Sequence, residues 1–154
     1  MKIKTLLSEK ENGHVIHTID AAATLLEVVK KLNKYKIGAL IVTAEKDGKE
    51  SYIGIITERN IIREMEKGRK DLLVTKVTAV MTKDVIVATP NDDIETVMAI
   101  MTRHKIRHIP IIENAQIVGM VSIGDIIQNL NQQAEITISH LSDYVGVTAK
   151  SKVY

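Results

Sequence analysis

Residues 54–60 read Gly-Ile-Ile-Thr-Glu-Arg-Asn, and residues 119–125 read Gly-Met-Val-Ser-Ile-Gly-Asp. Both stretches begin with a glycine and continue with two apolar residues. Each then places a hydroxyl side chain three positions before an amide or an acid. A short apolar run is typical of a buried strand, and the spacing of the polar pair is typical of the start of a helix. Each stretch therefore predicts a strand that turns directly into a helix.

The sequence before each stretch repeats as well. A short apolar run, a segment with helical spacing of apolar residues and a β-branched run follow one another in both copies. They lie at 15–18, 25–32 and 39–43 in the first copy and at 85–87, 94–101 and 108–112 in the second. Because order, spacing and residue class agree, each copy is predicted to fold as β-α-β-β-α. The fold class is therefore α/β (α+β), with two tandem repeats.

The helix ends can also be predicted. Thr24 with Glu27, and Asp92 with Glu95, have the spacing of a capping box at the start of a helix. The helix after the second stretch is expected to end near Gln132. The β-branched runs are continuously apolar, which is typical of strands that are buried on both faces.

A single copy of about 60 residues buries only a small core. Two copies packed sheet to sheet, with pseudo-two-fold symmetry, would bury much more, so the pair is expected to form one folding unit. We place the first copy and an N-terminal segment at 1–78, and the second copy at 79–134. A C-terminal tail whose role is not readable from the sequence occupies 135–154.

The polar pairs Thr57/Asn60 and Ser122/Asp125 allow two interpretations. A hydroxyl followed three residues later by an acid or amide can simply cap a helix. The same place also offers unpaired N–H groups at a helix N-terminus, together with side chains that could accept hydrogen bonds from the hydroxyls of a ribose. Residue types alone favour the capping interpretation and leave the second open.

The two stretches resemble the motif Gly-h-h-Ser/Thr-x-x-Asp of the cystathionine-β-synthase (CBS) domain family, in which h is apolar. Residues 80–85, Val-Met-Thr-Lys-Asp-Val, resemble the family's linker into a second domain, and residues 105–111 resemble its central strand. The resemblance covers roughly residues 12–132 and extends to the regulatory CBS pair of inosine-monophosphate dehydrogenase. It implies a domain pair that binds AMP, ADP, ATP, S-adenosylmethionine or NAD-type ligands in clefts between the copies.

The resemblance also implies which residues bind. In the family, the Asp holds the ribose, the Ser or Thr lies beside it, and the first and central strands line an adenine slot. Carried over by position, the second copy's site would use Thr82, Val85, Ile106, Arg107, His108, Ser122 and Asp125. The first copy's site would use Ile16, Ile37, Gly38, Ala39, Thr57 and Asn60. Near a nucleotide, Arg59 and Arg107 become candidate phosphate ligands, and Asn60 departs from the motif because an amide carries no charge.

Composition argues against several other classes. The formal net charge is +2, aromatic residues make up 3 %, and no stretch is apolar enough for a membrane span. We therefore expect no nucleic-acid partner, no membrane partner and a cytoplasmic location. Without cysteine there is no thiolate chemistry, and His104 and His108 flank a predicted helix-to-strand junction that does not suit a metal site.

No nucleophile–base pair and no phosphate-binding loop of the Walker type is recognisable, so we expect no enzyme activity and no catalytic cofactor. The prediction is a non-catalytic regulatory module that takes AMP, ADP, ATP or NAD(H) as its ligand. A homodimer is expected, and so is a possible regulated protein that the sequence does not identify. The alternative is a scaffold or dimerisation module that has no ligand and regulates a separate partner protein.

Overall fold

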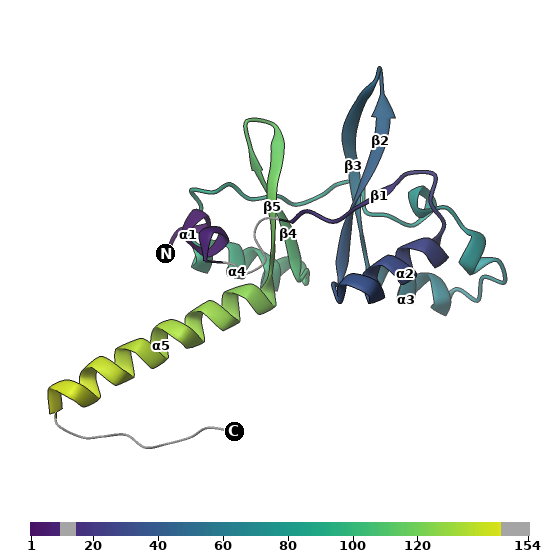
Figure 1. Ribbon diagram of the computed structural model, residues 1–154. Helices are drawn as coiled ribbons and strands as arrows, with labels where there is room; N and C mark the ends of the chain where they lie inside the picture. Colours follow the sequence, from purple (N-terminus) through teal and green to yellow (C-terminus); the bar gives the residue numbers. More distant parts are fainter. Residues whose placement is uncertain (10–14, 146–154) are drawn as a thin grey trace.

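The computed structural model describes residues 1–9 and 15–145. The first copy comprises β1 (Thr18–Asp20), α2 (Leu25–Tyr35), β2 (Ala39–Lys46), β3 (Lys49–Thr57) and α3 (Glu58–Glu66). The second comprises α4 (Ile94–His104), β4 (His108–Glu113), β5 (Gln116–Ser122) and α5 (Ile123–Val145). A short helix, α1 (Ile3–Ser8), precedes the first copy, and two 3-10 turns, η1 (Leu72–Val74) and η2 (Val77–Ala79), connect the copies (Figure 1). The predicted mixed fold of two tandem repeats is confirmed.

The two sheets are built alike but differ in their first strand. In the first copy β1 pairs in parallel with β2, which pairs antiparallel with β3. In the second copy the strand predicted at 85–87 is reduced to one bridge, between Ala88 and Ile111. The reason is Pro110, which occupies the position of Ile41 in the first copy. The Ile41 N–H donates to the His17 carbonyl, and proline has no N–H with which to make that bond.

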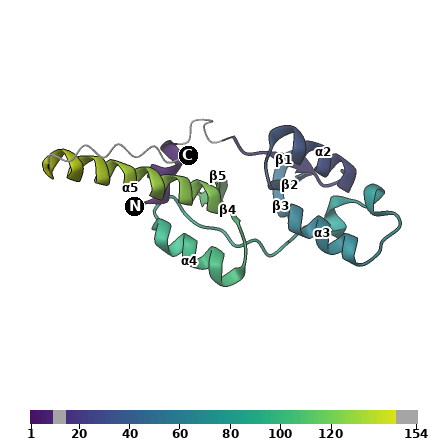
Figure 2. The same ribbon diagram turned by 90° about the horizontal axis from the view of Figure 1, so that it is seen from below.

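The sheets face each other across a small apolar layer. Ala39, Ile41 and Ile55 of the first copy are buried there, and side chains of the second copy, including Val85 and Met120, pack against them. Each copy also has its own core between its sheet and its helices. Both hairpins point the same way in Figure 1, and Figure 2 separates α2 and α3 of one copy from α4 and α5 of the other. The predicted packing of sheet on sheet is therefore observed.

The N-terminal segment belongs with the second copy rather than the first. Ile3, Leu6 and Leu7 of α1 are buried in the second copy's core. The backbone N–H of Ile3 donates to the Asp92 carbonyl at 3.0 Å. The division by sequence groups this segment with the first copy, at 1–78. The structure instead places its helix on the second copy, so the chain crosses between the copies before β1 (Figure 1).

Helix boundaries differ from the sequence prediction in two places. The box at Thr24 and Glu27 is present, with the Thr24 N–H donating to the Glu27 carboxylate at 2.7 Å. At α4 the N-cap is Asp93 and not Asp92. The Asp92 carboxylate instead accepts a hydrogen bond, at 2.6 Å, from the N–H of Thr89, three residues before it.

The last helix is longer than predicted. α5 runs for 23 residues to Val145, whereas we expected an end near Gln132. Residues 133–145 contain neither glycine nor proline, so nothing in the chain stops the helix. The apolar side chains Ile136, Ile138 and Leu141 stay exposed on it. The predicted end of the helix came too early because the apolar residues of this part do not form a buried helix face. The C-terminal part of α5 projects away from the rest of the molecule (Figure 1).

Candidate functional site

Two clefts lie between the copies, and each contains one of the polar pairs. The Asp125 cleft has a volume of about 500 Å³ and includes Ser122 and Asp125 of the second copy with Ile37, Gly38 and Ala39 of the first. The Asn60 cleft has a volume of about 240 Å³. The predicted site residues that line the Asn60 cleft are Thr57, Arg59, Asn60, Thr82, Val85, Ile106 and Arg107. Gly38 and His108 line both clefts.

This grouping corrects the assignment by copy. The sequence places Thr82, Val85, Ile106 and Arg107 with Asp125, but they line the Asn60 cleft. It places Ile37 and Ala39 with Asn60, but they line the Asp125 cleft. The cause is the path of the chain. The linker pairs with β3 through two hydrogen bonds between Ile55 and Thr82, at 2.9 and 2.8 Å, before it enters the second copy. Each copy's entry segment thus passes the turn of the other copy, and each cleft is built from both copies.

One predicted residue lines neither of the two clefts. Ile16 packs against the apolar layer between the sheets. Its neighbours Val15 and His17 line the Asp125 cleft instead. Residues that alternate along an extended segment point to opposite sides. The prediction therefore identified the correct segment of the cleft wall, but the side chains that face the cleft are those of the residues on either side of Ile16.

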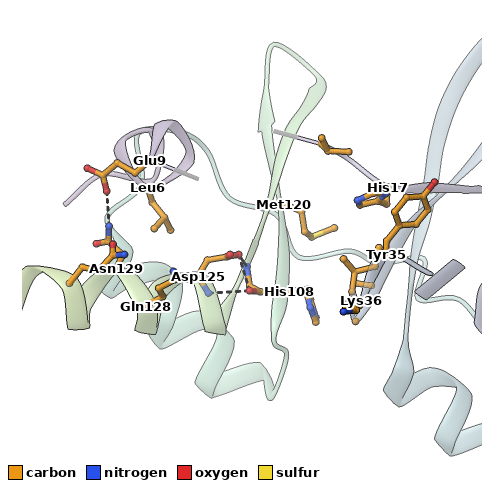
Figure 3. A pocket seen from close by; sticks show the side chains of 16 residues that line it. Leu6, Glu9, His17, Tyr35, Lys36, His108, Met120, Asp125, Gln128 and Asn129 are labelled. Atoms are coloured by element: carbon orange, nitrogen blue, oxygen red, sulfur yellow. Dashed lines mark hydrogen bonds between the residues drawn. The ribbon is translucent and has the colours of Figure 1, made fainter. Parts of the chain in front are cut away.

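The turn at Asp125 is closed by three short hydrogen bonds. The Asp125 Oδ2 atom accepts from the backbone N–H of Ser122 at 2.7 Å and from its hydroxyl at 2.8 Å. The Ser122 Oγ atom in turn accepts from the Asp125 N–H at 3.2 Å. The capping interpretation is therefore confirmed for this pair. The carboxylate also lies in the wall of a cleft, facing the first copy (Figure 3). Its capping role is therefore compatible with contact to a ligand in that cleft.

Asn60 is held on both sides of its amide. Its Oδ1 atom accepts from the Thr57 N–H at 3.0 Å and from the Thr57 hydroxyl at 2.7 Å. Its Nδ2 atom donates to the Val80 carbonyl at 3.3 Å and to the Thr82 hydroxyl at 3.2 Å. An amide can do both because it carries an acceptor and a donor, whereas a carboxylate only accepts. Asn60 therefore fastens the linker to the start of α3.

We expect Asn60→Asp to weaken the protein rather than to restore a binding motif. The new carboxylate would face the Val80 carbonyl, and the two hydrogen bonds from Nδ2 would be lost. The expected loss is about 1 kcal/mol of unfolding free energy, measured by urea denaturation. Asn131→Asp, at an exposed position on α5, is the matched control. An unchanged or increased stability of Asn60→Asp would contradict the fastening role.

An aromatic wall faces Asp125 across its cleft. The rings of His17 and Tyr35 lie 4.3 Å apart between centroids and are tilted by 35°. Burial lowers the pKa of His17, and the positive charge of Lys31 lowers it further. The imidazole is therefore neutral at neutral pH. Ile37 of the first copy and Met120 of the second add apolar side chains to the cleft, and Figure 3 shows the Met120 side chain extending toward His17.

Several lining residues were not predicted. Gln128, Asn129 and Gln132 on α5 line the Asp125 cleft, and they lie three, four and seven residues after Asp125. That spacing places them on the same helix face, which the sequence could have indicated. Arg63, four residues after Arg59, joins the Asn60 cleft in the same way. Leu6 and Glu9 of the N-terminal segment had no signal, because their docking depends on tertiary contacts.

The family model for the CBS domain matches residues 13–67 and again residues 77–132. The chain belongs to the CBS domain family. Both matches contain one polar pair, so the two clefts lie between two CBS domains. The residues that the structure describes contain no cluster of three or more His, Cys, Asp or Glu side chains that could hold a metal ion. Within the same ranges, no helix has the length and apolar character needed to cross a membrane.

Known CBS proteins resemble this chain over most of its length. A mitochondrial CBS domain-containing protein of Arabidopsis thaliana is 34 % identical over 79 % of this chain, which spans only 60 % of that relative. A CBS-domain protein from Agrobacterium tumefaciens has a solved structure with a TM-score of 0.76 and 33 % identity, covering 82 % of this chain and 91 % of its own.

A second solved structure contains ligands. The CBS domain pair of protein MJ0100, in complex with 5′-methylthioadenosine and S-adenosyl-L-methionine, has a TM-score of 0.70 at 23 % identity. The similarity covers 86 % of this chain and 98 % of that one, and shows the shared fold. These relatives are CBS-domain proteins, and the chain is a CBS pair, a regulatory module.

Proposed function

We propose that this CBS pair binds adenosine compounds, adenine nucleotides among them, reversibly and without transforming them, and acts as a regulatory sensor. The observation that carries the proposal is the composition of the Asp125 cleft. A carboxylate at a strand-to-helix turn of one copy faces an apolar and aromatic wall of the other. The carboxylate suits the hydroxyls of a ribose, and the wall suits the flat face of a base. AMP, ADP, ATP and NAD(H) all contain this adenosine unit.

A ligand in such a cleft would touch both copies at once. Its ribose would lie at Asp125 of the second copy, and its base would lie against His17 and Tyr35 of the first. Binding would therefore favour one arrangement of the copies, which is how a module without catalysis can report a ligand. The related pair that was solved with 5′-methylthioadenosine and S-adenosyl-L-methionine supports an adenosyl ligand. We place this action in the cytoplasm, with a separate regulated protein as its target.

A thermal-shift screen tests the proposal against the alternative of a scaffold without a ligand. At a hundred times the dissociation constant, a ligand adds about 2.7 kcal/mol to the stability of the folded state. For a chain of this size that corresponds to a rise in Tm of roughly 5–10 °C. AMP, ADP, ATP, NAD and adenosine are the compounds to test, with guanosine and inorganic phosphate as controls. No shift with any adenosine compound at millimolar concentration would favour the scaffold.

We further propose that the protein is a homodimer. Ile62 on α3 and Ile127 on α5 occupy equivalent positions in the two copies, and their exposed fractions are 64 % and 49 %. Met65, one turn after Ile62, is 60 % exposed. Such a pseudo-symmetric apolar pair fits a self-complementary contact with a second copy of the chain.

Ile62→Glu should therefore convert the dimer to a monomer, because the contact would bury a charge in each chain. Light scattering at micromolar concentration should give twice the 17.1 kDa of one chain for the unmodified protein and a single mass for the variant. Leu73→Glu is the control, since Leu73 is similarly exposed, at 56 %, but lies in η1. A monomeric unmodified protein would refute the homodimer.

A further inference from the structure

The two clefts differ in charge. The side chains that line the Asn60 cleft include four cations, Arg59, Arg63, Lys105 and Arg107, and one anion, Asp84. Those that line the Asp125 cleft include one cation, Lys36, and two anions, Glu9 and Asp125. His108 lies in the wall of both and does not distinguish them. The larger cleft thus favours neutral or positively charged groups, and the smaller favours anions.

The cations of the Asn60 cleft come from both copies and meet at one end of it. The Arg59 guanidinium, in the first turn of α3, donates to the backbone carbonyl of Lys105. Arg63 lies one turn further along α3. Arg107 follows Lys105 in the second copy and lies 3.7 Å from Glu58, with half of its side chain exposed. Guanidinium groups form charge-assisted hydrogen bonds with phosphate oxygens, and Arg59 lies at the start of α3, where the helix dipole is positive, whereas Arg63 lies in the last turn of that helix.

The Asp125 cleft ends in hydrogen-bond acceptors instead. Asn129 is 5 % exposed, and its Nδ2 atom donates to the Glu9 carboxylate at 2.7 Å. The Oδ1 atom of the same amide is buried and has no hydrogen-bond partner among the residues that the structure describes. A buried acceptor without a partner costs free energy that a donor from a ligand would recover. The Glu9 carboxylate and the Asn129 oxygen at this end would repel a phosphate, and the neighbouring amides of Gln128 and Gln132 carry no positive charge to offset them.

We infer that the clefts divide two kinds of ligand between them. The Asn60 cleft takes the ligand that carries phosphates, and recognises it mainly through Arg63 and Arg107. The Asp125 cleft takes an adenosine derivative without phosphates, whose far end donates hydrogen bonds to Asn129. This inference rests on the proposed function, since it assumes that adenosine compounds bind between the copies. It differs from the expectation from sequence for Arg107, which was assigned to the Asp125 site but lines the Asn60 cleft.

Calorimetric titration with ADP and with adenosine tests the division. Arg63→Gln should weaken ADP binding about ten-fold, because a charge-assisted hydrogen bond is lost. It should leave adenosine binding unchanged. Arg103→Gln is the matched control, since Arg103 is an exposed arginine on α4 that lines neither cleft. Raised salt should weaken the binding of ADP and not that of adenosine.

Three outcomes would overturn the inference, and they are distinguishable. If ADP binding falls with Lys36→Gln and not with Arg63→Gln, the phosphates lie in the Asp125 cleft, and the proposed function still stands. If ADP and adenosine compete for a single site, the division is wrong, and the proposed function again stands. If neither compound binds the unmodified protein, both the division and the proposed function fail.

Discussion

Asp125→Ala should reduce the affinity for adenosine by about ten- to a hundred-fold, which corresponds to about 1.5–3 kcal/mol for hydrogen bonds to a charged acceptor. The ribose hydroxyls would lose their acceptor in the Asp125 cleft. The carboxylate also caps α5 through its bonds to Ser122. Because loss of a cap costs only about 1 kcal/mol, the fold should survive the substitution. Titration calorimetry gives the affinity, and thermal unfolding gives the stability.

Asp92→Ala is the control that separates the two roles of Asp125, capping a helix and binding ribose. The Asp92 side chain makes the same kind of contact, accepting from the Thr89 N–H at 2.6 Å, but it lies in the wall of neither cleft. Asp92→Ala should lower stability by less than Asp125→Ala, because one side-chain hydrogen bond is lost rather than two, and it should leave adenosine binding unchanged. An Asp125→Ala protein with the affinity of the unmodified protein would mean that Asp125 is only a cap.

Ile3→Ala should destabilise the protein by about 2–5 kcal/mol, the range for an isoleucine or leucine truncated in a core. Ile3 is fully buried, at 0 % exposed, although it is the third residue of the chain. Its side chain belongs to the core that also holds Ile94 and Val97 of α4. The truncation would therefore leave a cavity in the second copy. Urea denaturation measures the change in unfolding free energy.

Lys4→Ala is the control for this experiment, because Lys4 is exposed on the same helix. It should change the stability by less than about 0.5 kcal/mol. If Ile3→Ala behaved like Lys4→Ala, α1 would not be docked on the second copy. Glu9, which follows α1, would then no longer be held beside Asn129. The assignment of Glu9 and Asn129 to one end of the Asp125 cleft would be wrong.

The sequence predicted the elements of the fold well where the two copies are alike. The strands β2, β3, β4 and β5 and the helices α2, α3 and α4 all lie where the repeat places them. It failed where one residue breaks the symmetry. Pro110 removes an N–H that the first copy uses, and the first strand of the second copy is lost with it. The docking of α1 was also not predictable, because a short apolar segment does not indicate which core it joins.

The candidate site was predicted by residue type but not by arrangement. Both polar pairs line clefts, as the family resemblance implies. The error was to build each site from a single copy, although the linker residue Thr82 bonds to Asn60 of the other copy. Sequence order cannot reveal this exchange, since it follows from the path of the linker along β3. The charge difference between the clefts depends on that exchange and could be seen only in three dimensions.

The most direct test of the central claim is a crystal structure of the protein grown with adenosine. We expect the ribose hydroxyls within hydrogen-bond distance of the Asp125 carboxylate, and the base against His17 and Tyr35. The Asn129 Oδ1 atom, which has no partner within the described part of the chain, should accept a hydrogen bond from the adenosine directly or through water. Adenosine bound away from Asp125, or both clefts empty at saturating adenosine, would contradict the account.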